Sequence, residues 1–519
     1  MSVLALSAGT AYAQSHLDAY KYAQTELSGT ARYLSMGGAF GALGGDISAM
    51  TSNPAGLAVY RSSEVVTTLS LSSIGSQTNW LGNKVDDNKT KFNFDNIAYV
   101  GYFPTGNDEG LVSWNVGFAY NRVKNYSRDY TANGGTGLNT SLSDYAAIRA
   151  YGLPTGDLIG TDNYDPYSNG DIGDWLSVLT YQAGYTVPYS DSKDNGVYNS
   201  AFTDAQGNPL TMQGAELRVR EWGSVDKYNL AFGLNFSDLL LLGANVSITD
   251  LGFHYASGYD EGMSENSNLY LDNNLETNGT GYTFNVGAIV RPVDFLRFGV
   301  AYNSPTWYKM TDTYQGRAGS DIPRLGDPLD AETPNGVYDY EYRAPDKWLF
   351  SAAAIFGTTA LLSVDYELTN YKNMDMYYAD GSSNVAVNQD ISDLYKVGNT
   401  LRVGAEVRVT PQFAVRAGVA YSDSPMKDLL KNGQVDVATV GTIPHYTIDK
   451  GAMSYSVGLG YRFTPNFYTD IACVFRSYKE DLYNFSSLTG DNGDALITPQ
   501  AATLKTNTTR VALTLGYKF

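Results

Sequence analysis

Beyond residue 61, apolar and polar residues alternate in segments of roughly ten residues, the pattern and length of a tilted strand that crosses a bilayer. In the last segment Val511, Leu513 and Leu515 share one face, whereas Arg510 and Thr514 lie on the other. This alternation predicts strands with one apolar and one polar face, which would also fit a half-buried sheet. Fourteen segments show it: 63–73, 93–104, 112–122, 225–236, 239–255, 279–292, 295–304, 338–356, 359–378, 398–409, 412–422, 448–463, 467–480 and 508–519.

Short and long connections alternate strictly between these segments. Six connections are tight and rich in turn residues; the other seven are long, and residues 123–224 form the longest. Short turns at one end and long loops at the other are typical of bacterial outer-membrane barrels, whose turns face the periplasm. The sequence therefore predicts an all-β fold, a 14-stranded antiparallel transmembrane β-barrel over residues 62–519. Because 123–224 is too long for a structureless loop, we expect it to form an extracellular cap.

Aromatic residues recur at the ends of the apolar faces, as in the pairs Phe413/Tyr421 and Tyr517/Phe519. Outer-membrane barrels carry such aromatic girdles at both membrane interfaces, whereas a soluble sheet has no need of them. The terminal Phe519 also resembles the outer-membrane assembly signal. These features favour the barrel over a soluble sandwich.

The segment before the strands is rich in glycine and differs in pattern. Two glycine pairs, Gly37-Gly38 and Gly44-Gly45, predict left-handed backbone and close packing. Asn53 followed by Pro54 predicts a helix start, with an asparagine cap and proline in the first turn. So compact and glycine-rich a segment must be held by something larger. Local physics leaves two placements open, a turn and helix packed on a soluble domain or a plug inside a barrel.

The ordered motif M-G-G-A-F…G-G-D-x-S-A…N-P-A-G-L-A over residues 36–58 resembles the N-terminal hatch of the FadL/TodX family. Members carry long-chain fatty acids and other hydrophobic compounds across the outer membrane of Gram-negative bacteria. The resemblance implies that residues 14–61 form a hatch, or plug, in the lumen, and that it moves to open a path. The implied hatch and gating residues are Asn53, Pro54, Ala55, Gly56, Gly37 and Gly38.

The resemblance also implies that cargo leaves sideways through an inward kink in the third strand. The third predicted strand contains Gly117 between Val116 and Phe118. A strand bends at least cost at glycine, so Gly117 is the expected kink. The alternative is that Gly117 merely makes room for the hatch.

Residues 1–13 are apolar and end in Ala11-Tyr12-Ala13, an A-x-A cleavage pattern. We expect the remnant of a signal peptide here, with Gln14 as the mature N-terminus. No lysine or arginine precedes Lys21, so the basic start of a signal peptide is missing and a truncated one is expected.

Charge and reactive residues narrow the function further. A net charge of −19 argues against nucleic-acid binding, which needs a basic surface. The single Cys473 excludes a disulfide framework, and three scattered histidines suggest no zinc site, so no metal or cofactor is expected. Two alternatives remain: a haem-binding or general surface-binding protein, with His254 or His445 as haem ligand, and an outer-membrane lipid hydrolase.

Transport of an apolar molecule requires an apolar pocket, and an acidic cargo also requires a positively charged group that binds its carboxylate. Arg402, Arg408 and Arg416 face the predicted lumen and are candidate carboxylate ligands. The alternative is that they pair with lumen acids such as Glu406, Asp365 and Glu367. The overall prediction is a monomeric, passive outer-membrane transporter of fatty acids or other hydrophobic molecules, not an enzyme. Its partners are that cargo and the surrounding lipid and lipopolysaccharide.

Overall fold

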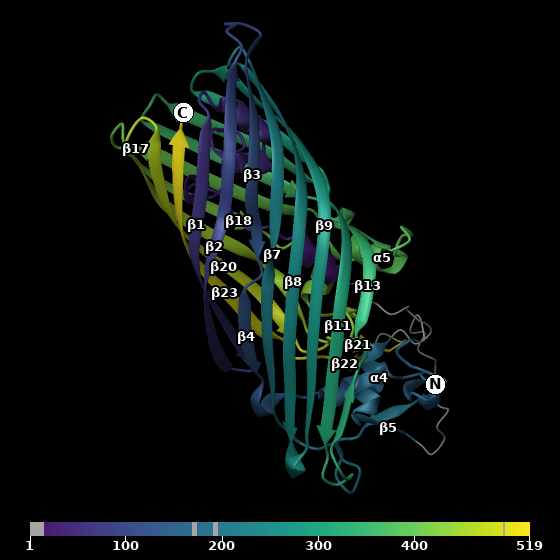
Figure 1. Ribbon diagram of the computed structural model, residues 1–519. Helices are drawn as coiled ribbons and strands as arrows, with labels where there is room; N and C mark the ends of the chain where they lie inside the picture. Colours follow the sequence, from purple (N-terminus) through teal and green to yellow (C-terminus); the bar gives the residue numbers. More distant parts are fainter. Residues whose placement is uncertain (1–14, 169–173, 190–195, 491, 493) are drawn as a thin grey trace.

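The computed structural model describes residues 15–168, 174–189, 196–490, 492 and 494–519, so the predicted signal segment lies outside it. Fourteen antiparallel strands of this described part close into a barrel, in which each strand pairs with the next and the last pairs with the first (Figure 1). The strands are β1 (Glu64–Trp80), β2 (Asn83–Pro104), β3 (Leu111–Asn125), β7 (Met212–Phe236), β8 (Leu240–Met263), β9 (Asn268–Val293), β10 (Leu296–Asn303), β14 (Lys347–Phe356), β15 (Ala360–Thr369), β17 (Gly398–Arg408), β18 (Phe413–Ser422), β19 (Tyr446–Arg462), β20 (Phe467–Tyr483) and β23 (Ala502–Lys518). The predicted all-β barrel and its strand number are confirmed.

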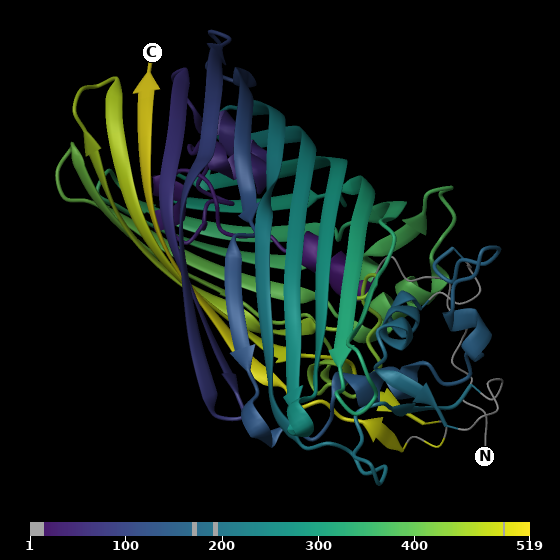
Figure 2. The ribbon, with the colours of Figure 1, turned by 60° about the horizontal axis from the view of Figure 1, so that its bottom comes forward.

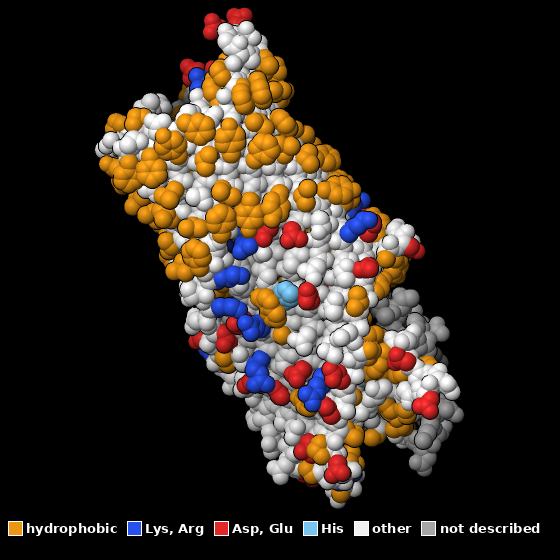
Figure 3. All heavy atoms as spheres, viewed as in Figure 1, with side chains coloured by type: hydrophobic (Ala, Val, Ile, Leu, Met, Phe, Trp, Pro, Cys, Tyr) orange, Lys and Arg blue, Asp and Glu red, His pale blue; other side chains and the backbone are white. Residues whose placement is uncertain are grey.

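An apolar belt surrounds the half of the barrel next to the six short turns, which we call the short-turn end (Figure 3). Side chains such as Val246 and Leu459 project from it, 58% and 49% exposed. Aromatic side chains line both of its borders, as the sequence predicted. Toward the long-loop end they are Phe92, Tyr228, Tyr282, Tyr366, Tyr421, Tyr455 and Phe475, and toward the short-turn end Phe103, Trp114, Phe295, Phe356, Phe463, Phe467, Tyr517 and Phe519.

Two connections predicted as long loops are regular hairpins instead. Strands β1 and β2 continue through residues 74–92 to a turn at Leu81-Gly82, and β8 and β9 continue through 256–278 to the short 3-10 helix η5 (Ser264–Asn266). Beyond the belt the outward face of these strands is polar, and in β8 and β9 the inward face carries buried apolar residues such as Tyr259, Leu271 and Leu275. The outward apolar face therefore ends while the backbone pairing continues, which is why the sequence pattern ended too early.

Two segments predicted as single strands are each divided. Residues 338–356 form β13 (Gly336–Arg343) and β14, separated at Pro345, which has no backbone N–H to continue a ladder. Residues 359–378 form β15 and β16 (Asp375–Tyr378), with η6 (Tyr371–Asn373) between them. Strand β13 pairs with β11 (Trp307–Asp321), and β11 pairs with the outer half of β9, so the wall continues beyond the belt with different strands.

The long loops fold into a cap over the far end of the barrel (Figure 2). Residues 123–224 contribute several short elements, so this loop has the structure expected of it: β4 (Arg128–Asn133), η3 (Gly135–Gly137), α3 (Leu142–Arg149), η4 (Thr155–Leu158), α4 (Trp175–Gln182), β5 (Thr186–Pro188) and β6 (Tyr198–Ser200). The other loops add β12 (Leu329–Glu332), α5 (Val385–Leu394), α6 (Asp428–Lys431), β21 (Leu488–Thr489) and β22 (Ala495–Ile497). None of the helices described combines the length and the apolar character needed to cross a membrane.

Residues 15–60, which we call the hatch, lie inside the barrel (Figures 1 and 2). They form α1 (His16–Ala23), α2 (Ala31–Ser35), η1 (Ile47–Thr51) and η2 (Pro54–Val59), and most of their side chains are buried. Of the two placements that the sequence left open, the structure has the plug.

Candidate functional site

Glycines of the wall mark where the hatch touches it. A Cβ atom at Gly243 of β8 would lie 2.2 Å from the backbone N of Ala55, and one at Gly418 of β18 would lie 2.2 Å from the N of Gly37. A larger residue at such a position would displace the hatch backbone. The inward-facing wall glycines that lie this close to backbone or side-chain atoms of the hatch are Gly233, Gly243, Gly287, Gly299, Gly404, Gly418 and Gly458. The sequence places these glycines on the polar face of their strands, but it does not show that the hatch packs against them.

Asn53 fastens the centre of the hatch. Its side chain is fully buried, and its Oδ1 accepts a hydrogen bond of 3.1 Å from the N–H of Ala55, which caps η2 as predicted. Its Nδ2 donates to the carbonyl oxygens of Gly41 at 2.6 Å and of Ala288 in β9 at 3.4 Å. One side chain thus joins the two halves of the hatch to each other and to the wall.

The paired glycines adopt the left-handed conformations expected of them. Gly37 has φ +62° and Gly38 φ +79°, and the N–H of Gly37 donates to Ser456 Oγ at 3.1 Å. Gly56 packs on Gly44, because a Cβ at Gly56 would lie 3.0 Å from the Gly44 Cα. These residues therefore shape the hatch; whether they move during transport stays a prediction.

Wall side chains also satisfy the hatch backbone. The N–H groups of Phe40 and Gly41 donate to one oxygen of Asp365, at 3.0 and 2.9 Å. Arg297 donates to the carbonyl oxygen of Leu43 at 2.7 Å, and Thr514 accepts from the N–H of Ala31 at 2.7 Å. Each such bond contributes about 1 kcal/mol, so the hatch is held by many weak contacts that can break in sequence.

The three arginines predicted as ligand-binding residues do not form one site. Arg402 pairs with Glu367 at 3.0 Å. Arg416 pairs with Glu406 at 2.7 Å and with Asp470, and half-exposed Arg408 lies 3.7 Å from Glu406. The hatch residue Arg32 also binds Glu406, at 2.9 Å. These contacts fit the alternative that the arginines pair with lumen acids, although Asp365 serves the hatch instead.

Two cavities lie in the lumen, which we call the outer and the middle cavity. The outer cavity, about 150 Å³, is nearer the cap, and the middle cavity, about 240 Å³, lies between α1 and the rest of the hatch. Residues 20–26 form a partition between them, and of these Tyr20, Gln24, Thr25 and Glu26 line both cavities. A third, polar pocket lies at the short-turn end and is lined by Arg408, Arg416 and Glu406.

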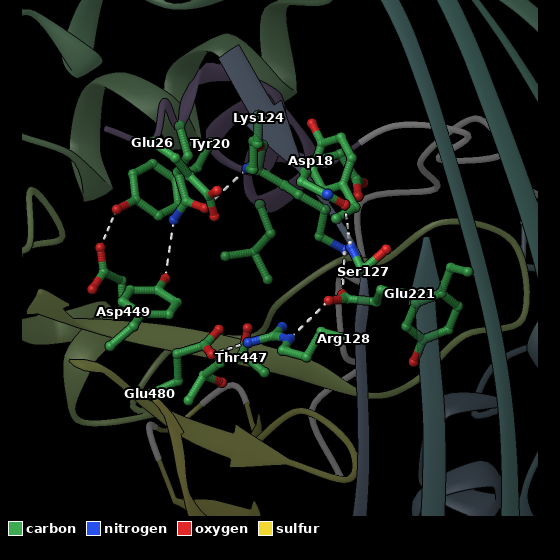
Figure 4. A pocket seen from close by; sticks show the side chains of 18 of the residues that line it. Asp18, Tyr20, Glu26, Lys124, Ser127, Arg128, Glu221, Thr447, Asp449 and Glu480 are labelled. Atoms are coloured by element: carbon green, nitrogen blue, oxygen red, sulfur yellow. Dashed lines mark hydrogen bonds and ion pairs between the residues drawn. The ribbon is translucent and has the colours of Figure 1, made fainter. Parts of the chain in front are cut away.

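Charged and aromatic side chains surround the outer cavity (Figure 4). Arg128 pairs with Glu221 at 2.9 Å and also with Glu480. Lys124 donates to the carbonyl oxygen of Lys21 at 2.7 Å and to Gln24, and so supports the partition from the wall. On the other side, the hydroxyl of Tyr20 donates to Asp449. A few polar contacts therefore keep the partition closed.

The middle cavity contains a cation without a partner. Lys227 of β7 lines it, and the side-chain ammonium of Lys227 has no hydrogen bond or ion pair within the described part of the chain. Lys347 lines the same cavity and pairs with Glu367 at 3.7 Å. Most of the remaining lining is polar, and apolar groups of Val225, Tyr308 and the hatch Leu27 lie among these polar side chains. Nothing in the sequence singled out Lys227, although its place between outward Asp226 and Tyr228 implied that it faces inward.

The wall is incomplete between β2 and β3. Their backbone pairing ends at Asn96 and Asn121, and farther from the short-turn end β2 pairs only with β1. We call this gap the seam. Side chains bridge it: Asn125 Nδ2 donates to Asn93 Oδ1 at 2.6 Å, Lys89 pairs with Asp129 at 2.7 Å, and the N–H of Thr131 donates to Asp87 at 2.7 Å. A narrow cleft behind it is lined by Glu26, Ser28, Asn93, Asp95, Arg122, Val123, Lys124, Asn125 and Arg510.

No register shift occurs at Gly117, the expected position of the kink. Gly117 pairs in regular register with Val100 on one side and with Ala231 on the other, and the register of β3 against β7 shifts instead between Arg122 and Lys124. A Cβ at Gly117 would lie 2.7 Å from Met50 Cε of the hatch. The geometry thus fits the alternative that this glycine makes room for the hatch, and a role in exit stays a prediction.

The histidines do not come together in one site. His254 lies on the outside of β8, where it stacks on Trp222 with ring centroids 5.1 Å apart. His445 is buried beside the outer cavity, its Nδ1 is 3.0 Å from the carbonyl oxygen of Asn484, and burial lowers its pKa to about 4. Because the two face opposite sides of the wall, they cannot hold the same group. No cluster of three or more metal-binding side chains occurs among the residues described.

Comparison with known proteins gives one family. The sequence profile of the outer membrane protein transport proteins (OMPP1/FadL/TodX) matches residues 227–519, more than half of the chain. No curated protein sequence matches significantly. The crystal structure of a Pseudomonas aeruginosa FadL homologue superposes with a TM-score of 0.54 at 15% identity, covering 96% of this chain and 99% of that one. A deltaS2 mutant of the monoaromatic hydrocarbon channel TodX gives 0.51 at 12% identity, covering 95% and 100%. At these identities the structures show a shared fold.

Proposed function

The chain belongs to the OMPP1/FadL/TodX family of outer membrane transport proteins, and we propose that it passes hydrophobic small molecules from the cell surface to the membrane by diffusion. As in the rest of the family, it is an outer-membrane β-barrel, so the apolar belt lies in the bilayer, the short turns face the periplasm and the cap faces outward. The observation that carries the proposal is the plugged lumen, in which two cavities share a partition and both share lining residues with the cleft behind the seam.

The first step is passage through the partition. Cargo that reaches the outer cavity is separated from the middle cavity only by residues 20–26. Tyr20 is held by Asp449, and Gln24 donates to the hydroxyl of Tyr478 at 3.0 Å. Exchanging these contacts for contacts with cargo opens the partition without unfolding the barrel, because the wall pairing does not depend on them.

The second step is sideways exit through the seam. Glu26 and Lys124, which lie beside the partition, also line the cleft behind the seam. On the outside of the wall, exposed Phe94 stacks on Tyr120 across the pair β2–β3, with ring centroids 5.8 Å apart, and Phe92 is 64% exposed. A molecule leaving here enters an apolar surface at the outer border of the belt. The hatch shifts around Asn53 to let cargo pass but stays within the lumen, which remains closed to water-soluble molecules.

The middle cavity suits an amphipathic molecule with a negative head group. Lys227 offers a positive charge without an ion pair, and the apolar groups of Val225, Tyr308 and Leu27 within a largely polar lining offer contact for part of a hydrocarbon chain, worth about 0.8 kcal/mol for each buried CH₂ group. A long-chain fatty acid meets both requirements, whereas an aromatic hydrocarbon uses only the lining. We therefore place a fatty acid first and an uncharged hydrocarbon second.

The test is uptake in a Gram-negative host that lacks its own fatty-acid transporter. Expression of this protein should restore uptake of labelled oleate, and native mass spectrometry of the purified protein should detect a bound lipophilic molecule. If neither oleate nor toluene enters faster than in cells carrying the empty vector, with the protein folded in the outer membrane, the proposal is wrong. Enzymatic activity has no part in it.

A further inference from the structure

Two lysines face each other across the outside of the wall. Lys479 of β20 is paired directly with Lys505 of β23, and both side chains are exposed. Like charges at directly opposed positions of an antiparallel pair destabilise it. Neither lysine has a hydrogen bond or an ion pair with any residue that the structure describes. A chain with a net charge of −19 thus leaves two adjacent positive charges uncompensated.

The nearest acids are occupied elsewhere. Gln77 of β1 is the other cross-strand partner of Lys505, and its amide donates to Asp86 at 2.9 Å. Asp481, two positions along β20, binds Lys450 at 2.5 Å. Glu480 points into the lumen, where it pairs with Arg128. Each of these three acids already has a partner, so the lysine pair forms a small basic surface.

The pair lies at a defined height above the membrane. Phe475 of β20 and Val511 of β23 are the outermost apolar residues of the belt on these strands, 50% and 46% exposed. Lys479 follows Phe475 by four residues, which at a rise of about 3.3 Å per residue and a tilt near 45° is about 9 Å. The polar head-group layer begins at the edge of the hydrocarbon and is some 5–8 Å thick. The backbone at Lys479 therefore lies just beyond this layer, and the long lysine side chains can bring their amino groups back to the level of the lipid head groups.

We propose that Lys479 and Lys505 together bind a phosphate group of an outer-leaflet lipid. A phosphate monoester carries close to two negative charges and several acceptor oxygens, so two ammonium groups across one strand pair match it in charge and in spacing. Binding removes the repulsion between the lysines, which explains why both are tolerated. The occupant is a phosphorylated glycolipid of the outer leaflet, because the site is outside the barrel and beside the belt. The inference needs the outer-membrane location but not the transport function.

The experiment compares lipid binding by wild-type protein and three variants in detergent. The probes are lipid A with both phosphates, lipid A with its phosphates removed, and inorganic phosphate, and binding is measured by native mass spectrometry. The variants are the double substitution Lys479→Glu/Lys505→Glu, the neutral Lys479→Gln/Lys505→Gln, and the control Lys84→Glu, an exposed lysine near the tip of the β1–β2 hairpin. We expect the wild type and the control to bind phosphorylated lipid A at least tenfold more tightly than the phosphate-free form. The double variants should lose this preference, the glutamates most.

Three results would overturn the proposal. The first is equal affinity of the wild type for the two forms of lipid A. The second is undiminished preference in both double variants. The third is saturation of the site by inorganic phosphate as readily as by the lipid, which would make it a site for a free anion. Because both side chains are exposed, the variants should keep the wild-type heat-modifiable migration on gels, which reports a folded barrel.

Discussion

Asn53 of the hatch lies against Gly287 of β9 so closely that a Cβ atom at residue 287 would be 2.0 Å from the Asn53 Oδ1 atom. The Asn53 side chain therefore occupies the space that the absent side chain of Gly287 leaves in the wall. The same relation recurs on β8, where Gly243 faces Ala55, and on β18, where Gly418 faces Gly37. The hatch is thus held in the barrel by shape as well as by hydrogen bonds.

We predict that Gly243→Ala loosens the hatch without unfolding the barrel. The added Cβ would lie 2.2 Å from the backbone of Pro54 and Ala55, an overpacking that costs about 1–3 kcal/mol. Leak of a small hydrophilic dye from proteoliposomes should rise. Gly262→Ala on the same strand is the matched control, because a Cβ there has nothing within 4 Å. Equal leak from the two variants would contradict the seating role of Gly243.

We predict that fixing the hatch to the wall stops transport reversibly. A Cβ at Gly287 would lie 2.9 Å from Asn53 Cγ, the position that a cysteine Sγ takes, so Asn53→Cys/Gly287→Cys in a Cys473→Ser background should form a disulfide. Oleate uptake should fall at least tenfold when the bond is oxidised and recover on reduction. Uptake that is the same in both redox states would show that the hatch need not move.

A bond across the seam should block exit. Asn93 and Asn125 are 2.6 Å apart at their amide atoms, so the pair Asn93→Cys/Asn125→Cys can be cross-linked by a short bifunctional reagent. We expect oleate to bind normally but to leave at least tenfold more slowly, as measured by release from preloaded protein into vesicles. Val457→Cys, which places a cysteine opposite the native Cys473 in a fully paired part of the wall, is the control. Free release after cross-linking the seam would place the exit elsewhere.

Lys227 should distinguish charged from uncharged cargo. Lys227→Gln removes the unpaired charge of the middle cavity, and a charge-assisted hydrogen bond is worth about 1.5–3 kcal/mol, so oleate should bind about tenfold or more weakly. Binding of an uncharged hydrocarbon should be unchanged, and Lys227→Arg should retain most of the affinity for oleate. An equal loss for both ligands in a calorimetric titration would mean that Lys227 acts only on the shape of the cavity.

The cap should dock more firmly at low pH. Glu261 at the outer end of β8 is buried and accepts hydrogen bonds from the N–H of Leu142 at 2.8 Å, from Tyr259 at 2.7 Å and from Ser141, which caps α3. Burial, with a smaller effect from Asp144, raises the pKa of Glu261 to about 7. Since the docked carboxyl binds its proton more tightly than a free one, docking is favoured below its ordinary pKa and weakens as pH rises through 7.

Glu261→Gln, which mimics the protonated acid, tests this directly. Hydrogen exchange of α3 should be similar in the wild type and the variant at pH 5.5, and faster in the wild type at pH 8.5. Comparison at each pH removes the intrinsic pH dependence of exchange. A constant ratio between the two proteins across this range would rule out the proposed protonation.

The sequence by itself determined the barrel. Lipid on one face and a polar lumen on the other impose a period of two, and this period gave the number of strands and all six short turns, while the aromatic residues marked both borders of the belt. Local chemistry also determined the helix N-cap at Asn53 and the left-handed conformation of the paired glycines, since both depend on residues adjacent in the chain.

Only the tertiary structure decided what fills the lumen and how. The seats at Gly243, Gly287 and Gly418, the unpaired Lys227 and the seam beside Asn96 are contacts between residues far apart in the chain, and a glycine or lysine on a polar face looks the same whether or not anything packs on it. Beyond the belt no lipid requires an apolar outer face, so there the strands extend farther than the sequence pattern predicted. Lipid contact depends on the residue pattern within each strand, whereas the fit of the hatch to the wall depends on contacts between different strands and the hatch.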